Sequence, residues 1–144
     1  MGTYNFNNDL TIAGKVEDTF ESLLKQSGYI TERRCNSDWD IRATNPKTGM
    51  VKTFEVKFDE MADYTGNIAI EYESRGKPSG ISITKAIYWV QYYGNKFHIM
   101  LVEDLKKELP DITWKDVVGG DVGSNTKIHL IKKDKFKDEC DIII

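Results

Sequence analysis

The sequence WDIRATNPKTGMVKTFEVKF, residues 39–58, decides the fold because it predicts a β-hairpin. Apolar and polar side chains alternate along residues 39–44, which is the period of a strand with one buried face. Residues 45–49, NPKTG, are rich in turn-forming residues and predict the connection. The alternation resumes along residues 50–58, which predict the second strand.

Three charged residues of this hairpin have the pattern of a metal-dependent hydrolytic site. Glu55 and Lys57 lie two residues apart on one strand, so both side chains leave the same face. Asp40 lies on the preceding strand, and whether it shares the face of Glu55 depends on the register of the pairing. Two carboxylates can hold a divalent cation, and a lysine can orient the water that attacks a phosphodiester. Asp38 has the same strand parity as Asp40 and is the alternative carboxylate.

A helix is predicted before the hairpin, over residues 8–27, with Gly28 as a suitable terminator. Its apolar residues recur at helical spacing and form one stripe. Glu17 falls about 80° from the centre of that stripe and Glu21 about 120°, on the helical repeat. We therefore expect Glu17 to reach the edge of the sheet as a further acidic ligand. Glu21 is expected to be more exposed to solvent and is the alternative.

The rest of the chain predicts strands and helices in mixed order. A second helix is expected from Ser82 to Tyr93, ended by Gly94, with its aromatic residues packed in the core. The other predicted elements are strands at 29–35, 67–73, 96–102 and 127–131, a loop or short helical turn at 59–66, a short helix at 103–109, a Gly-rich turn at 117–125 and a charged tail at 133–139. The C-terminal DIII could extend a sheet edge or a dimer interface. Together these elements predict an α/β fold with a mixed sheet.

The composition fits one compact soluble domain spanning 1–144. The chain has 40% hydrophobic and 30% charged residues, which excludes a disordered protein. It has no apolar run that could span a bilayer and no basic region followed by an apolar one, so a cytoplasmic location is expected. Its two cysteines do not match zinc-ligand spacing. A net charge of −3 counts against a nucleic-acid partner, although bound cations would reverse the sign locally.

The acidic helix residue Glu17, Asp40 in SDWDI, and Glu55 and Lys57 in FEVKF together resemble the PD-(D/E)XK nuclease superfamily. The resemblance covers roughly residues 10–93. It implies a restriction-endonuclease-like mixed β-sheet core flanked by α-helices. The role it implies is Mg²⁺- or Mn²⁺-dependent cleavage of DNA, as in junction-resolving, homing or restriction, or phage-type enzymes.

The resemblance also implies a division of roles. Asp40, Glu55 and the backbone carbonyl of Val56 would hold the metal ion. Glu17 would bind a second ion or a metal-bound water, and Lys57 would position the attacking water. A non-catalytic DNA-binding module on the same fold is the alternative.

Residues 74–82, SRGKPSGIS, combine cations, glycines and hydroxyls just before the expected second helix. Backbone N–H groups at a helix N-terminus, with nearby cations, favour phosphate. Arg75, Lys77, Ser79 and Lys85 are therefore predicted to contact the DNA backbone, although the segment could equally be a plain surface loop. Cleavage of both strands by subunits with one site each generally needs two copies, so a homodimer is expected.

Overall fold

The computed structural model describes residues 6–34, 38–119, 123 and 125–144. Its strands are β1 (Ile30–Arg33), β2 (Ile41–Thr44), β3 (Val51–Phe58), β4 (Asn67–Ser74), β5 (Lys77–Pro78), β6 (Tyr88–Tyr93), β7 (Lys96–Leu101), β8 (Thr113–Gly119), β9 (Thr126–Lys132) and β10 (Ile142–Ile143). Its helices are α1 (Phe6–Gln26), α2 (Ala62–Thr65), α3 (Val102–Ile112) and α4 (Lys133–Glu139), with a 3₁₀ turn η1 (Gly80–Ser82).

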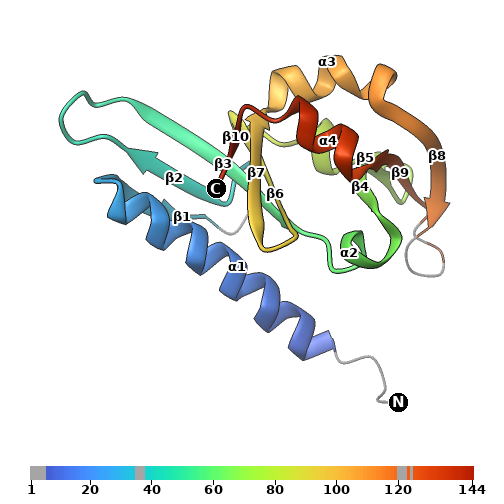
Figure 1. Cartoon of the computed structure of the whole chain (residues 1–144), viewed down its shortest axis with the longest axis horizontal. Helices are drawn as coiled ribbons and strands as arrows, with labels where there is room; N and C mark the ends of the chain where they lie inside the picture. The colour runs from blue at the N-terminus through green and yellow to red at the C-terminus, as the bar shows by residue number, and fades with distance from the viewer. Residues whose placement is uncertain (1–5, 35–37, 120–122, 124) are drawn as a thin grey trace.

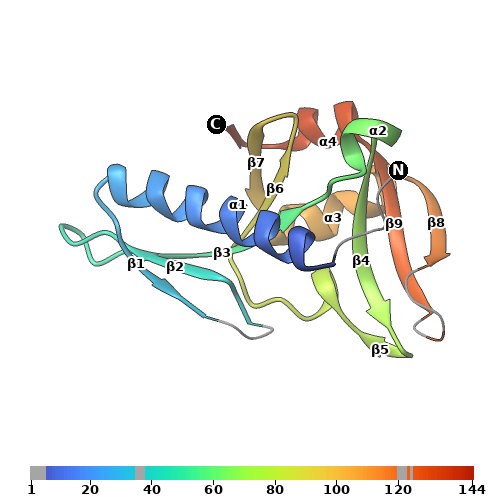
Figure 2. The same ribbon diagram turned by 90° about the horizontal axis from the view of Figure 1, so that it is seen from below.

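The strands form two sheets (Figures 1 and 2). The larger sheet has the order β1-β2-β3-β6-β7-β10, and the smaller sheet has the order β5-β4-β9-β8. In the larger sheet β3 and β6 run parallel, whereas its other neighbouring strands run antiparallel. In Figure 2, α1 lies along β1, β2 and β3, while β4, β9 and β8 stand at the other end of the molecule. The predicted fold class, a mixed sheet flanked by helices, is confirmed.

The predicted hairpin is formed by β2 and β3. Ile41 pairs with Phe54 and Thr44 with Val51, so residues 45–49 form the connection as expected. The apolar side of both strands is buried against α1, which ends where predicted, since Gly28 has φ +93°. This first core contains Val16, Phe20, Ile41, Ala43, Phe54, Val56, Val90, Phe97 and Ile99. Each such side chain contributes about 1.5–3 kcal/mol when fully buried.

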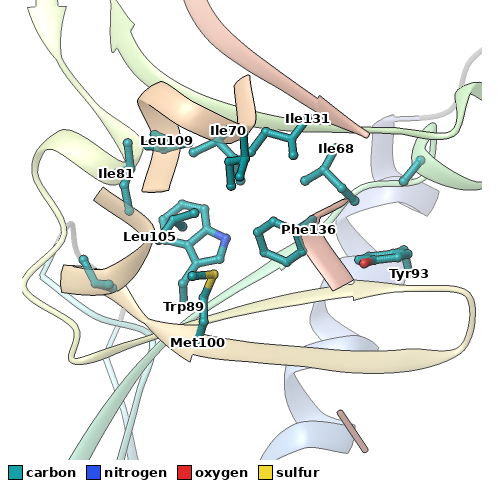
Figure 3. Close-up of a cluster of buried hydrophobic side chains, with 13 residues drawn as sticks. Ile68, Ile70, Ile81, Trp89, Tyr93, Met100, Leu105, Leu109, Ile131 and Phe136 are labelled. Carbon is teal, nitrogen blue, oxygen red and sulfur yellow. The ribbon is translucent and has the colours of Figure 1, made fainter. Parts of the chain in front are cut away.

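A second core fills the space between the larger sheet, the smaller sheet, α3 and α4 (Figure 3). Trp89 from β6 and Phe136 from α4 are almost completely buried in it. Ile68 and Ile131 pair across β4 and β9 and point into the same cluster. Glu55, Trp89 and Lys57 lie on this side of the larger sheet, because Glu55 pairs with Trp89 and Lys57 lies two residues further along.

The expected helix from Ser82 to Tyr93 is wrong. Half of this segment, residues 88–93, is β6, whose two faces pack into the first core through Val90 and into the second core through Trp89 and Tyr93. A strand buried on both faces loses the apolar–polar alternation that identifies an exposed strand. Gly94 and Asn95 both have positive φ and form the tight turn to β7, so Gly94 ends a strand. The prediction that its aromatic residues pack in the core is confirmed for Trp89 and Tyr93.

Three other predictions differ from the structure. Arg75 and Gly76, both with positive φ, form a tight turn from β4 to β5 where a loose loop was expected. The expected charged tail forms α4, which buries Phe136. Residues 113–119 form the unpredicted strand β8 through pairing with β9, and part of the expected Gly-rich turn lies outside the described residues. The C-terminal DIII adds β10 to the edge of the larger sheet, as predicted. None of the helices within the described ranges is long and apolar enough to span a bilayer.

A substitution at Gly80 tests how closely the segment before β6 packs against β4. Its φ is +53°, and an added Cβ would lie 2.2 Å from the Glu71 carbonyl oxygen. We expect Gly80→Ala to lower the free energy of unfolding by about 3 kcal/mol, the sum of left-handed strain and a backbone clash. Gly76→Ala is the matched control, because Gly76 has φ +73° but open space around its Cβ position. It should cost about 1–2 kcal/mol. Equal urea midpoints for the two variants would contradict this explanation.

Candidate active site

The hydrogen bonds at the start of β2 show where Asp40 lies. The regular pairing of β2 with β3 begins at Ile41 and Phe54. The Asp40 N–H donates to the Phe54 carbonyl at 2.9 Å, one residue out of that register, so Asp40 lies at an irregular step of the ladder. The Asp40 carboxylate lies close to Glu55, because its charge raises the pKa of Glu55 and its Oδ2 accepts from the neighbouring Val56 N–H.

The Asp40 carboxylate occupies the place where β2 stops pairing with β3. Its Oδ2 accepts a hydrogen bond of 2.8 Å from the Val56 N–H. In a regular strand the N–H and C=O of one residue point to the same side, so the Val56 carbonyl points toward the same gap. Asp40 and the two backbone groups of Val56 thus meet at one point.

Glu55 is held beside Lys57 and is mostly enclosed. The residue is 7% exposed, and its Oε1 lies 3.3 Å from Lys57 Nζ. Its Oε2 is buried and has no hydrogen-bond partner among the residues that the structure describes. Lys57 is about half exposed, with Nζ 5.8 Å from the centre of the Trp89 ring. Burying a carboxylate oxygen without a hydrogen-bond donor is costly, and a nearby positive charge reduces that cost.

The electrostatics of the site point the same way. Burial raises the pKa of Glu55, and repulsion from Asp40 adds to the shift against the opposing attraction of Lys57. Burial also raises the pKa of Asp40, although the Val56 N–H and Lys57 favour its charged form. Two neighbouring carboxylates that are costly to ionise are stabilised by a cation that binds between them.

Glu17 approaches this pair but has its own partner. Burial and repulsion from Asp40 raise the pKa of Glu17, which couples it electrostatically to the site. Its Oε2 lies 2.5 Å from an Arg33 nitrogen, and Arg33 also contacts Asp18 and Glu21. Glu17 is thus a neighbour of the site that is ion-paired to β1.

The expectation that Glu21 is more solvated than Glu17 is wrong. Its side chain is 17% exposed, against 29% for Glu17. The reason is a local contact, because the Thr31 hydroxyl donates to Glu21 Oε2 at 2.7 Å and draws the carboxylate onto β1. That hydrogen bond lowers the pKa of Glu21, whereas the pKa of Glu17 is raised. Asp38 is likewise engaged elsewhere, with cations of Arg34 and Lys85 at 3.4 and 3.8 Å.

The donor set suits a hydrated magnesium or manganese ion better than a fully enclosed one. Within residues 6–34, 38–119, 123 and 125–144, no three His, Cys, Asp or Glu side chains are placed to hold a metal ion together. Mg²⁺ is commonly bound through one or two carboxylates and keeps several waters. That pattern fits the oxygens of Asp40, Glu55 and the Val56 carbonyl. Among them, Glu55 Oε2 has no hydrogen-bond partner within the described residues, so a bound ion would stabilise it most.

The fold leaves three of the four predicted DNA-contacting residues exposed and buries the hydroxyl of the fourth. Arg75 and Lys77 lie exposed on the β4–β5 hairpin, and the Lys85 side chain is 75% exposed beside Asp38. The Ser79 hydroxyl is buried, so it does not face solvent. The helix N-terminus that was to bind phosphate is absent, because η1 has three residues and no helix follows it. The prediction of a phosphate site at a helix N-terminus is therefore wrong.

The alternation of β2 carries a further signal, since Arg42 shares the strand parity of Asp40. Arg42 was not among the residues that the sequence predicted for the site. Its guanidinium carbon lies 5.5 Å from the centre of the Trp39 ring, and Arg34 lies at the same distance. Both arginines thus flank Trp39, the residue before Asp40.

The fold of this chain is similar to that of one solved structure. It matches the structure of the bacterial homing endonuclease I-Ssp6803I with a TM-score of 0.52, over 85% of this chain and 78% of that chain. The two sequences are 15% identical, so the likeness establishes the fold alone. No family model matches the sequence, and no curated protein matches it.

Replacing Asp40 should stabilise the metal-free protein. Because the folded-state pKa of Asp40 is raised, ionisation costs stability as the pH rises above the ordinary carboxylate range. Asp40→Asn should therefore raise the melting temperature in EDTA at pH 7.5 by roughly 3 °C. The gain should shrink as the pH falls and vanish below about pH 3, where the carboxyl is protonated in both the folded and the unfolded state.

Glu21→Gln is the matched control for this experiment. The pKa of Glu21 is lowered in the fold, so its ionised form adds stability that is present at neutral pH and lost on acidification. The control should therefore melt at a lower temperature than the wild type at pH 7.5. A fall in melting temperature for Asp40→Asn as well would show that the Asp40 carboxylate is not strained in the fold.

Proposed function

We propose that this chain is a divalent-metal-dependent DNA endonuclease of the PD-(D/E)XK type. The observation that carries the proposal is the proximity of the Asp40 and Glu55 carboxylates beside the Val56 backbone, with a buried Glu55 oxygen that has no hydrogen-bond partner among the described residues. Lys57 lies beside them on the same face. The similarity of the fold to that of a homing endonuclease supports DNA as the substrate.

The residues take separate roles in this proposal. Asp40, Glu55 and the Val56 carbonyl hold a Mg²⁺ or Mn²⁺ ion. When bound, the ion supplies positive charge for the phosphate and a more acidic water. Lys57 keeps one amine N–H donor on Glu55 Oε1 and directs its other N–H donors toward the attacking water or the phosphate.

Glu17 has an indirect part in the same scheme. Its ion pair with Arg33 fixes α1 against β1 next to the site. In that place it can orient a water near Asp40, as the resemblance implies, while Arg33 shields the pair from a third full negative charge. A second metal ion would require Glu17 to give up part of its contact with Arg33.

The cleavage pattern follows from one site per chain. One chain cuts one strand at a time, so double-strand cleavage calls for a homodimer. Light scattering of the protein with and without duplex DNA measures this directly. Homing, restriction and junction-resolving roles differ in whether plain duplex or branched DNA is cut faster.

Lys57 provides the test of chemistry. Nicking of supercoiled plasmid should require Mg²⁺ or Mn²⁺, stop with EDTA, and slow by about 10²–10⁴-fold in Lys57→Ala, the usual range for loss of a proton-transfer or water-orienting group. Lys107→Ala is the matched control, since Lys107 is exposed and ion-paired on α3 and should cleave at the wild-type rate. Full activity of Lys57→Ala would rule out the assignment. Metal binding without cleavage of any DNA form would identify a binding module.

Metal binding should be unusually sensitive to acid. The raised pKa values of Asp40 and Glu55 mean that protons compete with the ion at a higher pH than for ordinary carboxylates, whose pKa is about 4. Calorimetric Mn²⁺ titrations between pH 5 and pH 8 should show the affinity falling well before pH 4 is approached. An affinity that stays constant down to pH 5 would contradict the proposed ligands.

A further inference from the structure

Two arginines share one tryptophan beside the candidate site. The guanidinium carbons of Arg34 and Arg42 each lie 5.5 Å from the centre of the Trp39 ring. Trp39 is 7% exposed, whereas the two arginine side chains are 47% and 44% exposed. Among the described residues Trp39 belongs to neither apolar core. The ring is thus covered while the guanidinium groups stay open to solvent.

The register fixes this Arg34–Trp39–Arg42 cluster next to the carboxylates. The Arg34 N–H donates to the Asp40 carbonyl at 2.9 Å, which continues the pairing of Arg33 with Ile41 by one step. Arg34 therefore lies across from Asp40 on the β1 side, while the Asp40 carboxylate accepts from the Val56 N–H on the β3 side. Arg42 follows Asp40 by two residues and leaves β2 on the same face, about 7 Å further along.

The arginines have hydrogen-bonding capacity to spare. Arg34 contacts Asp38 at 3.4 Å, and Arg42 contacts Glu32 on the neighbouring strand. Each guanidinium carries five N–H donors, so one carboxylate leaves donors for a second acceptor. Exposed ion pairs of this kind contribute little to stability, and exchanging a carboxylate for a phosphate costs little.

Stacking on an aromatic ring also suits the guanidinium group for phosphate recognition. The contact with the ring face holds the planar group in one orientation and leaves its N–H edge free. That edge can bind a phosphate with two parallel hydrogen bonds. A lysine in the same place would supply charge without that geometry.

We propose that the Arg34–Trp39–Arg42 cluster binds DNA backbone phosphates next to the cleaved one and positions that strand over Asp40 and Glu55. The proposal rests on the proposed function for its substrate. It adds a binding surface of the β1–β2 face to the exposed cations Arg75, Lys77 and Lys85. Because the cluster contacts only the backbone, it should act on every DNA sequence alike.

Binding and chemistry can be separated experimentally. Affinity for a fluorescent duplex is measured in EDTA by anisotropy, at several salt concentrations. Arg34→Ala and Arg42→Ala should each reduce the slope of log K against log salt by about one and weaken binding equally for unrelated sequences. Lys107→Ala removes an exposed, ion-paired cation from α3 and should leave the slope unchanged.

Two further variants distinguish stacking from charge alone. Arg42→Lys keeps the charge, so it should keep the salt slope and still lose affinity, because the planar group is gone. Trp39→Leu should weaken binding with both arginines present. Urea midpoints close to that of the wild type for Arg42→Lys show that the loss is not unfolding.

The outcomes separate the two proposals. Wild-type slopes for both arginine variants overturn the cluster as a phosphate site, even if metal-dependent cleavage is observed. The expected slopes without any cleavage by the wild type support the cluster and overturn the nuclease. Failure of the wild type to bind DNA in EDTA at any salt concentration overturns the cluster, and failure to bind in Mg²⁺ as well overturns both proposals.

Discussion

The geometry of the site depends on one hydrogen bond, from the Val56 N–H to the Asp40 carboxylate. The backbone of β2 leaves β3 after Asp40 donates to Phe54, while β3 continues to Phe58 in parallel pairing with β6. The next inward-facing amide, that of Val56, would then lack a partner, and a buried N–H without an acceptor is costly. The Asp40 carboxylate accepts it at 2.8 Å. A break in the strand ladder and the placement of a carboxylate are therefore the same structural event.

In that arrangement the ionised carboxylates of the site are energetically unfavourable. Glu55 Oε2 is buried without a donor among the described residues, and burial raises the pKa values of Asp40, Glu55 and Glu17 together. Lys57 offsets part of the negative charge, and Arg33 offsets another part on the α1 side. A chain selected for stability alone would place amides or apolar residues at such positions, so strained groups of this kind are typical of functional sites.

The sequence was sufficient for the hairpin and its charged residues because both depend on local periodicity. Alternation and a turn predict which residues share a face, but only the structure shows that Asp40 leaves the register and that its carboxylate reaches the Val56 N–H beside Glu55. β6 could not be predicted in this way, since its surroundings, β3 and the second core, come from distant parts of the chain. β8 likewise exists through pairing with β9. Arg34 and Arg42 were missed because their significance lies in sharing Trp39 beside Asp40, which is a tertiary contact.

The acidic net charge of −3 does not weigh against a nucleic-acid partner once the charges are located. Asp40 and Glu55 repel a phosphate brought near them by Arg34 and Arg42, unless a cation lies between the carboxylates and the phosphate. Cation binding therefore strengthens phosphate binding at this face, and by linkage a bound phosphate strengthens cation binding by the same factor. An acidic pair next to an arginine cluster thus makes each ligand depend on the other. If both proposals hold, DNA should therefore raise the affinity of the site for the ion.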